Sequence, residues 1–112
     1  MFIHIDSKFS YFDSNAKIDQ LQHEVKYSNV VVLPNRLSGQ WGELSLVKIE
    51  IELYSYALQY ARTHGIEYKI YHLLSGQDLP LHSQDYIHDF IDRHPNQEFL
   101  EFERLCGTSE KL

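Results

Sequence analysis

Two aspartates stand directly after apolar segments of this chain, at places where a carboxylate could bind a ligand. Asp6 closes the run Phe-Ile-His-Ile at residues 2–5, and Asp78 ends the turn-rich run Ser-Gly-Gln-Asp after residues 68–74. A carboxylate there can accept hydrogen bonds from hydroxyl or imide N–H groups of a nucleotide. Aspartate is also common in ordinary turns, so the local pattern leaves both interpretations open and favours the turn.

Backbone groups could add to these carboxylates. Gly76, beside Ser75, would let the main chain approach a ligand closely, although the run lacks the glycine repeats or the Gly-Lys-Ser/Thr ending of a phosphate-binding loop. Trp41 and Gly42 precede a predicted helix whose first N–H groups attract anions, and the Trp41 ring could stack on a base or a sugar. The alternatives are a plain turn at residues 75–78 and a hydrophobic cap formed by Trp41.

Metal ligation and acid–base catalysis receive less support from the spacing. His4 and Asp6 alternate along one predicted strand, but no third ligand follows at a recognisable distance, so we predict no zinc site and no metal cofactor. Glu101 and Glu103 alternate near the end of the chain, yet no pair can be given acid and base roles. Glu50 lies within the apolar arc of a predicted helix, so we expect it to be buried with a partner, serving either the fold or a cleft.

The composition excludes several classes of protein. The 112 residues include 10 Lys and Arg against 16 Asp and Glu, a formal charge of -6. This acidic balance argues against nucleic acid as a partner, because phosphate contacts need clustered basic side chains. The single Cys106 excludes an internal disulfide, and no apolar run is long enough for a membrane span or a signal peptide. We expect one cytoplasmic domain, with peripheral attachment to a membrane as the alternative.

Hydrophobic periodicity predicts strands that alternate with helices. Strands are predicted at residues 2–5, 29–33, 68–74 and 97–102. Helices are predicted to begin after caps at residues 13–15, to run from 43 to 64 with a stop at Gly65, and to begin again at Ser83. The order β-α-β-α-β-α-β predicts a Rossmann-like α/β fold, a mostly parallel sheet with helices on both faces. The strand ends near residues 6, 34 and 75 should then form one ligand pocket.

Longer runs of residues carry a family resemblance. The run Tyr-His-Leu-Leu-Ser-Gly-Gln-Asp-Leu-Pro-Leu-His-Ser at residues 71–83, continuing through Ile87, Phe90 and Glu98-Phe99, resembles the core-2/I-branching family of glycosyltransferases. That family includes β-1,6-N-acetylglucosaminyltransferases and peptide O-xylosyltransferases. Residues 3–8 resemble its second strand, and Trp-Gly at 41–42 with Ser-Leu-Val at 45–47 resembles the start of its long helix.

The resemblance implies a GT-A-like fold that transfers N-acetylglucosamine or xylose from a UDP-sugar donor to a hydroxyl of a glycan or peptide acceptor, with inversion. It implies that Asp6 holds the uridine and that the other donor contacts come from Trp41, Gly42, Ser45, Ser75, Gly76 and Asp78. Asp78 would stand where many GT-A enzymes carry an Asp-x-Asp metal motif. Here Leu79-Pro80 follows it, as in metal-independent members.

Departures from the family pattern limit what we expect of this chain. His82 stands where the motif usually has Lys. The opening strand of the family is expected before Met1, and the catalytic base, the acceptor-binding half and the basic diphosphate-binding residues beyond Leu112. We therefore expect residues 1–106 to be a partial donor-binding domain that is inactive or feeble by itself, followed by a polar tail at 107–112. The alternative is a non-catalytic nucleotide-binding or protein-interaction module. An open sheet edge would favour self-association in either case.

Overall fold

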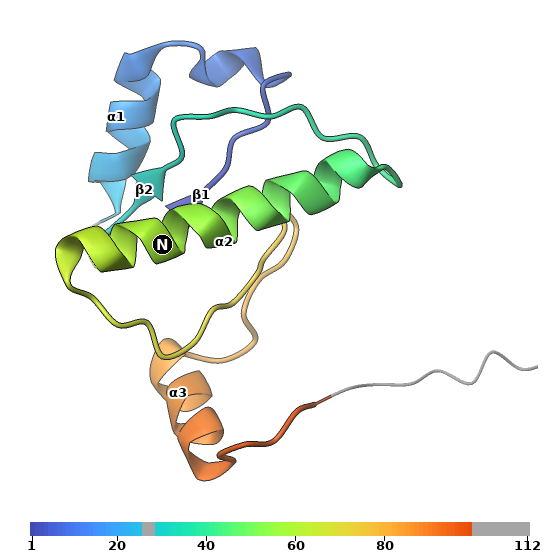
Figure 1. Ribbon diagram of the computed structural model, residues 1–112. Coiled ribbons are helices and arrows are strands. Elements are labelled where there is room, and N and C mark those ends of the chain that lie inside the picture. Colours follow the sequence, from blue (N-terminus) through green and yellow to red (C-terminus); the bar gives the residue numbers. More distant parts are fainter. Residues whose placement is uncertain (26–28, 100–112) are drawn as a thin grey trace, which may run out of the picture. The chain divides into compact units, whose positions relative to one another are not determined.

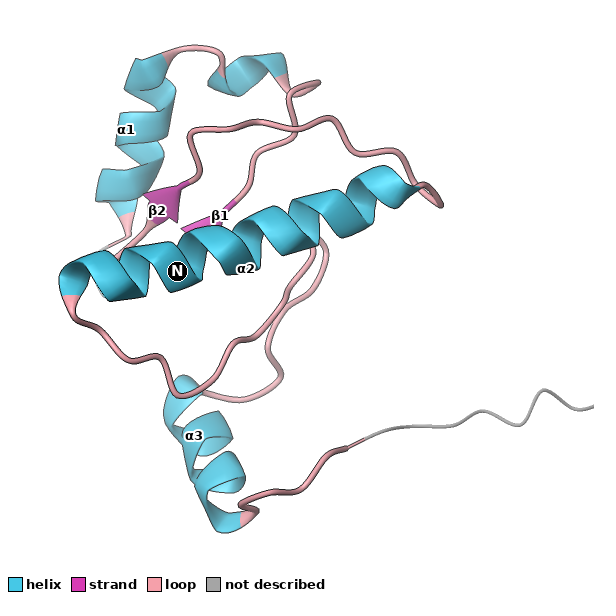
Figure 2. Ribbon diagram, in the orientation of Figure 1, coloured by secondary structure: helices cyan, strands magenta, loops and turns pink. Residues whose placement is uncertain are grey.

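A computed structural model describes residues 1–25 and 29–99 of the chain. Its elements follow in the order β1 (Phe2–Ile3), the 3-10 helix η1 (Ser10–Phe12), α1 (Asn15–Glu24), β2 (Val31–Val32), α2 (Leu44–His64) and α3 (Gln84–Arg93), as Figures 1 and 2 show. The chain divides into two compact units, Met1–Leu73 and Leu74–Leu112. The first unit holds the sheet with η1, α1 and α2, and the second holds α3.

The sheet of the first unit consists of β1 and β2, which pair in parallel. Phe2 lies opposite Val31 and Ile3 opposite Val32. The N–H of Val31 donates to the carbonyl of Met1 at 2.9 Å, which starts the ladder. Because η1 and α1 connect the two strands, this part of the chain is the predicted β-α-β unit.

The hydrophobic core lies between this sheet and α1. Ile5, Val30 and Val32 form a buried cluster, against which Ile18 and Leu21 of α1 pack. The spacing of Ile18 and Leu21 places both on one face of the helix, as the sequence predicts. The predicted helix after residues 13–15 is therefore confirmed, together with the face that it buries.

The opposite face of the sheet packs against α2 (Figure 1). The Phe2 ring contacts Tyr56 and Tyr60 edge to face, with centroids 6.1 and 5.4 Å apart. Such a pair contributes about 0.5–1.5 kcal/mol beyond the area that it buries. Ala57 and Ala61 are the buried residues of α2, and their small side chains let the helix lie close to the strands. Helices on both faces of the sheet are thus confirmed for this unit.

Local signals place the C-terminal end of α2 and the start of α3 where the sequence predicts them. Gly65 ends α2 in the left-handed region at φ 64°, and its N–H donates to the carbonyl of Ala61. Glycine adopts this conformation without the steric cost of a Cβ. At the start of α3 the Ser83 side chain accepts a hydrogen bond from the N–H of Tyr86 at 3.3 Å, which is a standard N-cap.

The predicted strand at residues 68–74 is wrong, because none of these residues is in a strand. A strand requires a neighbour that pairs with its backbone, whereas this segment is held by ring contacts. The Tyr68 ring lies 5.9 Å from that of Phe2, and the Tyr71 ring lies 6.0 Å from that of Tyr54. Aromatic side chains thus give the segment its apolar pattern without strand pairing.

The other predicted strands are shorter than expected. β1 and β2 cover two residues each. Residues 97–99 are not in a strand, and the rest of the predicted strand at 97–102 lies outside the described residues. The part of the chain that the structure describes is therefore a mixed α/β fold with a two-stranded parallel sheet and three α-helices, rather than the larger Rossmann-like sheet.

Glu50 is exposed, so its predicted burial is wrong. The sheet covers the C-terminal half of α2, where Ala57 and Ala61 are buried. Nearer the start of the helix, Val47 and Ile51 are also exposed, by 46% and 59%. The apolar arc is real, but the part of it that holds Glu50 and Ile51 is uncovered, so a carboxylate there stays in water. Among the described residues, no helix is both long and apolar enough to cross a bilayer.

Candidate functional site

Asp6 lies just beyond β1, where its carboxylate joins two segments of the first unit. Oδ1 accepts the N–H of Lys8 at 2.8 Å, and Oδ2 accepts the N–H of Gly39 at 2.9 Å. The Lys8 ammonium lies 3.9 Å from Oδ2 and donates to the carbonyl of Gly39. The Asp6 side chain keeps 34% of its surface exposed. Asp6 is therefore fixed in place and still accessible to a ligand.

These contacts determine the charge of Asp6. Hydrogen bonds from the N–H groups of Lys8 and Gly39 lower the pKa of the Asp6 carboxyl, and the positive charge of Lys8 adds to them. The carboxylate is thus ionised at neutral pH. It has about four lone-pair positions, of which the two N–H groups occupy two. The remaining positions can accept hydrogen bonds from a ligand.

His4, two residues earlier, holds the same neighbouring segment. Its Nε2 atom accepts the N–H of Leu37 at 2.9 Å, so Nε2 is unprotonated and the ring proton of the neutral form is on Nδ1. Burial lowers the pKa of His4, although the charge of Asp6 opposes that change. The N–H of Ser7 donates to the carbonyl of Leu37 at 3.2 Å. His4 and Asp6, which alternate along the chain as predicted, therefore both accept hydrogen bonds from backbone N–H groups of the segment at residues 37–39.

Gly39 lets the segment at residues 37–39 pack against α2. It is buried, and a Cβ at this position would lie 3.0 Å from side-chain atoms of Ile49 and Leu46 and 3.4 Å from Oδ2 of Asp6. Contacts of 3.0 Å are tighter than most, so with a larger residue here the ends of the Ile49 and Leu46 side chains would have to shift by a few tenths of an ångström. Gly39 is not among the predicted site residues, and its only signal in the sequence is a glycine shortly before Trp41.

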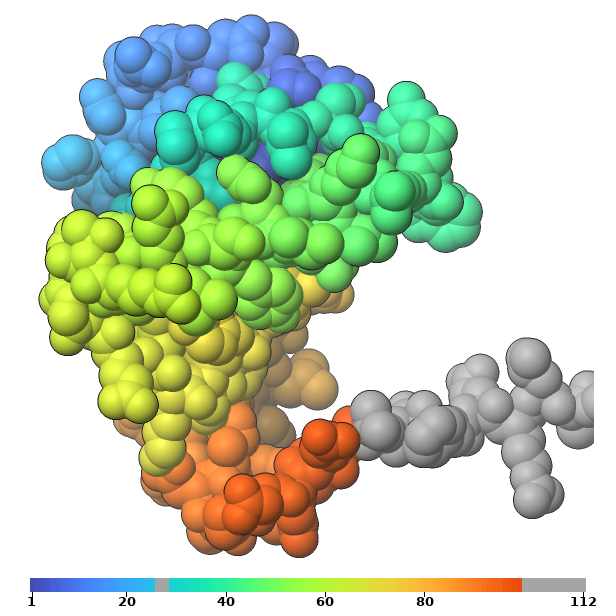
Figure 3. Space-filling model, viewed as in Figure 1, coloured from blue at the N-terminus to red at the C-terminus, as the bar shows by residue number. Residues whose placement is uncertain are grey.

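Of the other predicted residues of the first unit, Trp41 and Gly42 lie in the loop between Gly39 and α2, and Ser45 lies in the first turn of α2. Figure 3 shows this part of the chain at the molecular surface. The N–H of Gln40 donates to Oγ of Ser45 at 2.9 Å, which ties the loop to the first turn of the helix. Gly42 has φ 78°, a left-handed conformation that favours glycine. Trp41 is 95% exposed, so the predicted hydrophobic cap over the helix start does not form. The structure thus connects Asp6, through Gly39, to the loop that carries Trp41 and Gly42, which Gln40 ties to Ser45 in the first turn of α2.

Ser75, Gly76 and Asp78 belong to the second unit, where they form a tight turn. The N–H of Asp78 donates to the carbonyl of Ser75 at 3.1 Å, and Oδ2 of Asp78 accepts the N–H of Ser75 at 2.8 Å. Hydrogen bonds from Ser75 lower the pKa of the Asp78 carboxyl. Gly76 has open space around it. The turn interpretation is correct locally, and a pocket shared with Asp6 stays a prediction.

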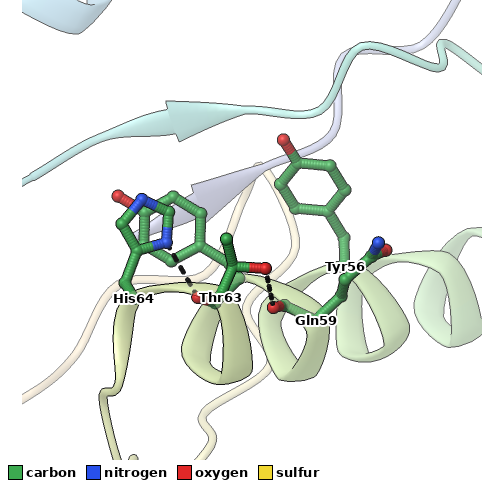
Figure 4. Close-up of a pocket in the computed structure, with 5 residues that line it drawn as sticks. Tyr56, Gln59, Thr63 and His64 are labelled. Carbon is green, nitrogen blue, oxygen red and sulfur yellow. Dashed lines mark hydrogen bonds between the residues drawn. The ribbon is translucent and has the colours of Figure 1, made fainter.

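A shallow hollow of about 280 Å³ lies along α2 in the first unit. It is lined by Tyr56, Gln59, Tyr60, Thr63 and His64. Figure 4 labels all of these except Tyr60. Thr63 Oγ1 donates to the carbonyl of Gln59 at 3.0 Å, and His64 Nδ1 lies 2.9 Å from the carbonyl of Tyr60. These polar atoms bond to their own helix instead of converging on a ligand, so the hollow is a weaker candidate than the surroundings of Asp6.

Among the described residues, the structure does not assign a catalytic base or a metal site. Cys106, Glu101 and Glu103 lie outside the described residues. Within residues 1–25 and 29–99 no group of three or more His, Cys, Asp or Glu side chains is placed to hold a metal ion. Neither observation names a catalytic base.

Comparison with known families decides the class of the protein. A family model described as Branch: Core-2/I-Branching enzyme matches residues 2–111. The chain belongs to the Core-2/I-Branching enzyme family. This confirms the resemblance that the sequence carries at residues 3–8, 41–47 and 71–83, and the family is one of glycosyltransferases, which use a sugar donor and an acceptor. No curated protein and no solved structure gives a significant match to the chain.

Proposed function

We propose that Asp6 and the loop at residues 39–45 form part of the uridine side of a UDP-sugar site. The observation that carries this proposal is an ionised, accessible carboxylate held by two backbone N–H groups, one of them from Gly39, two residues before the exposed Trp41. Membership of a glycosyltransferase family supports it, because such an enzyme must hold a sugar donor.

Asp6 is suited to select uridine because a carboxylate only accepts hydrogen bonds. The ribose hydroxyls and the imide N–H of uracil are donors. Hydrogen bonds to an ionised acceptor are shorter and stronger than neutral ones. Because the N–H groups of Lys8 and Gly39 already hold the carboxylate, it needs little reorganisation when the nucleotide arrives.

Trp41 supplies the apolar part of the same site. Stacking of a base on an aromatic side chain contributes about 1–3 kcal/mol. The Trp41 ring is almost fully exposed, so the ligand would remove a large apolar surface from water. Ser45 holds the loop through Gln40, and Gly42 has open space around it, which permits close approach of a sugar or phosphate.

The reaction that we propose is a single displacement with inversion. The acceptor hydroxyl of a glycan or peptide loses its proton to a carboxylate base, and its oxygen attacks the anomeric carbon of N-acetylglucosamine or xylose. The bond from that carbon to the phosphate oxygen breaks, and UDP leaves with the electron pair. We also propose that the fold is GT-A-like, that Ser75, Gly76 and Asp78 contact the donor, and that no metal takes part.

Binding of UDP to the full chain tests this proposal directly. Trp41 is the only tryptophan, so its fluorescence reports on the site. We expect saturable quenching by UDP, and a loss of affinity of about tenfold or more in Asp6→Asn, since a hydrogen bond to a charged group contributes about 1.5–3 kcal/mol. Asp19→Asn on α1 is the matched control, with unchanged affinity.

The same titration separates the two candidate functions. Leu44, Val47, Ile51 and Leu58 are exposed apolar residues of α2, which favours a protein-interaction module as the second candidate. No change in fluorescence or in amide NMR signals at millimolar UDP would reject the donor site and favour that module. Equal affinities of the wild type and Asp6→Asn would remove Asp6 from the site.

A further inference from the structure

The Arg36 side chain lies inside the loop that follows β1. Its exposed fraction is 16%. The guanidinium donates from Nε, Nη1 and Nη2 to backbone carbonyls and one carboxylate of this loop. The acceptors are the carbonyls of Ile5 at 3.4 Å, Asp6 at 3.0 Å, Phe9 at 2.7 Å and Phe12 at 3.1 Å, and Oδ1 of Asp13 at 2.7 Å.

These contacts use the whole donor capacity of the side chain. A guanidinium has five N–H groups, one on Nε and two on each of Nη1 and Nη2. Arg36 has one acceptor for Nε, two for Nη1 and two for Nη2. No N–H remains for a phosphate, so Arg36 acts on the loop instead of on a donor molecule.

The loop has few other constraints. Its backbone contains short turns, such as the bond from the N–H of Phe9 to the carbonyl of Asp6 at 3.0 Å. Phe12 packs against the core, whereas Phe9 and Tyr11 are 58% and 57% exposed, so burial holds one end of the loop and contributes little elsewhere. Arg36, a charged donor that binds several carbonyls, is therefore the main polar element that orders this loop.

Arg36 and its chain neighbours hold Asp6 from both ends. The guanidinium binds the carbonyl of Asp6, and the N–H of Gly39, three residues after Arg36, binds its carboxylate. Between them, Leu37 bonds to both His4 and Ser7. Segment 36–39 thus positions both the backbone and the side chain of Asp6, and the N–H of Lys8 adds a second bond to the carboxylate.

We propose that Arg36 is a positioning residue that sets the place and direction of the Asp6 carboxylate for the nucleotide. It does so without contacting the nucleotide. The inference rests on the proposed function of Asp6 but makes a separate claim about how the site is ordered.

The experiment compares Arg36→Met and Arg36→Lys with Arg62→Met, a substitution of an exposed arginine on α2. UDP affinity is measured by Trp41 fluorescence, and amide hydrogen exchange is measured at Lys8 and Gly39, whose N–H groups bind Asp6. We expect Arg36→Met to weaken UDP binding about tenfold or more, as for a lost charged hydrogen bond. Exchange at Lys8 and Gly39 should accelerate while exchange within α2 stays unchanged.

Arg36→Lys keeps the charge but has three donors, so we expect an intermediate loss of affinity. If Arg36→Met fails to fold, the affinity and hydrogen exchange of Arg36→Lys still test the proposal. Wild-type affinity in both Arg36 variants would overturn the positioning role and leave the proposed function intact. Absence of UDP binding in the wild type would reject the proposed function. In that case unchanged exchange at Lys8 and Gly39 in the variants would also reject the positioning role, as would equal acceleration throughout α1 and α2.

Discussion

His4 and Asp6 show how two neighbouring side chains acquire low pKa values for different reasons. The pKa of Asp6 falls because backbone N–H groups bind its charged form, whereas the pKa of His4 falls because burial disfavours its charged form. Both effects keep the pair in the state that the structure needs. Asp6 is ionised and can accept from Gly39, and His4 is neutral and can accept from Leu37.

A pH dependence follows from His4. Its pKa in the folded chain is below the ordinary value of 6.5, so the unfolded chain binds the proton first as the pH falls. The stability that His4 contributes is therefore complete above about pH 6.5 and is lost as the pH falls from there toward the folded pKa. The loss of the Leu37 hydrogen bond should also weaken UDP binding.

Urea unfolding and UDP titration measure this dependence between about pH 7.5 and 5.5, the range in which histidines usually titrate. His4→Gln should flatten both profiles. His23→Gln, which changes an exposed histidine of α1, should leave them unchanged. Identical profiles for the wild type and His4→Gln would contradict the assignment to His4.

Gly39 gives a prediction about close packing. In Gly39→Ala the new Cβ would lie 3.0 Å from the Cδ atoms of Ile49 and Leu46, so these side chains must shift by a few tenths of an ångström. We expect a loss of about 1–3 kcal/mol in the free energy of unfolding, together with weaker UDP binding. Gly76→Ala is the matched control, because nothing lies within 4 Å of its Cβ position. Equal unfolding free energies for the two variants would show that the site near Asp6 can relax freely.

At the scale of elements, α2 is the longest one, and its C-terminal end has a simple test. Gly65 has φ 64°, where a Cβ is unfavourable. Gly65→Ala should lower the free energy of unfolding by about 1 kcal/mol, measured by urea denaturation of the circular dichroism signal. Gly65→Asn should cost less, because asparagine tolerates the left-handed region. An unchanged midpoint for Gly65→Ala would mean that the end of α2 frays without affecting the fold.

The three helices could be predicted from local sequence, whereas the predicted third strand, at residues 68–74, could not. Ser83 and Gly65 act within one turn of their own helix, so their roles can be inferred from a short window. A strand depends on a distant partner that short windows do not contain. Residues 68–74 have the apolar residues of a strand, but Tyr68 and Tyr71 use their rings against Phe2 and Tyr54.

At the scale of the whole molecule, the described residues leave much apolar surface uncovered. The sheet has two strands, so one edge of each lacks a neighbour among the described residues. Val47 and Ile51 on α2 are 46% and 59% exposed. Unpaired edges and apolar patches both promote association between chains.

We therefore expect concentration-dependent oligomers, measured by light scattering of the full chain. Ile51→Lys should reduce the mean mass if the face of α2 contributes to the contact, because a charge is costly in an apolar interface. Glu50→Gln, at an exposed neighbouring position, changes the charge by the same amount and is the matched control. A monodisperse monomer at all concentrations would show that the uncovered surfaces do not associate.

The sequence by itself determined the family, the three helices with two of their caps, and the two strands of the β-α-β unit. Each of these depends on a run of neighbouring residues or on a periodic pattern. Only the tertiary structure decided that Gly39 binds Asp6, that Arg36 orders the loop before α1, and that Glu50 lies in water. The physical reason is separation along the chain. Asp6 and Gly39 are 33 residues apart, and a hydrogen bond over that distance has no local signal.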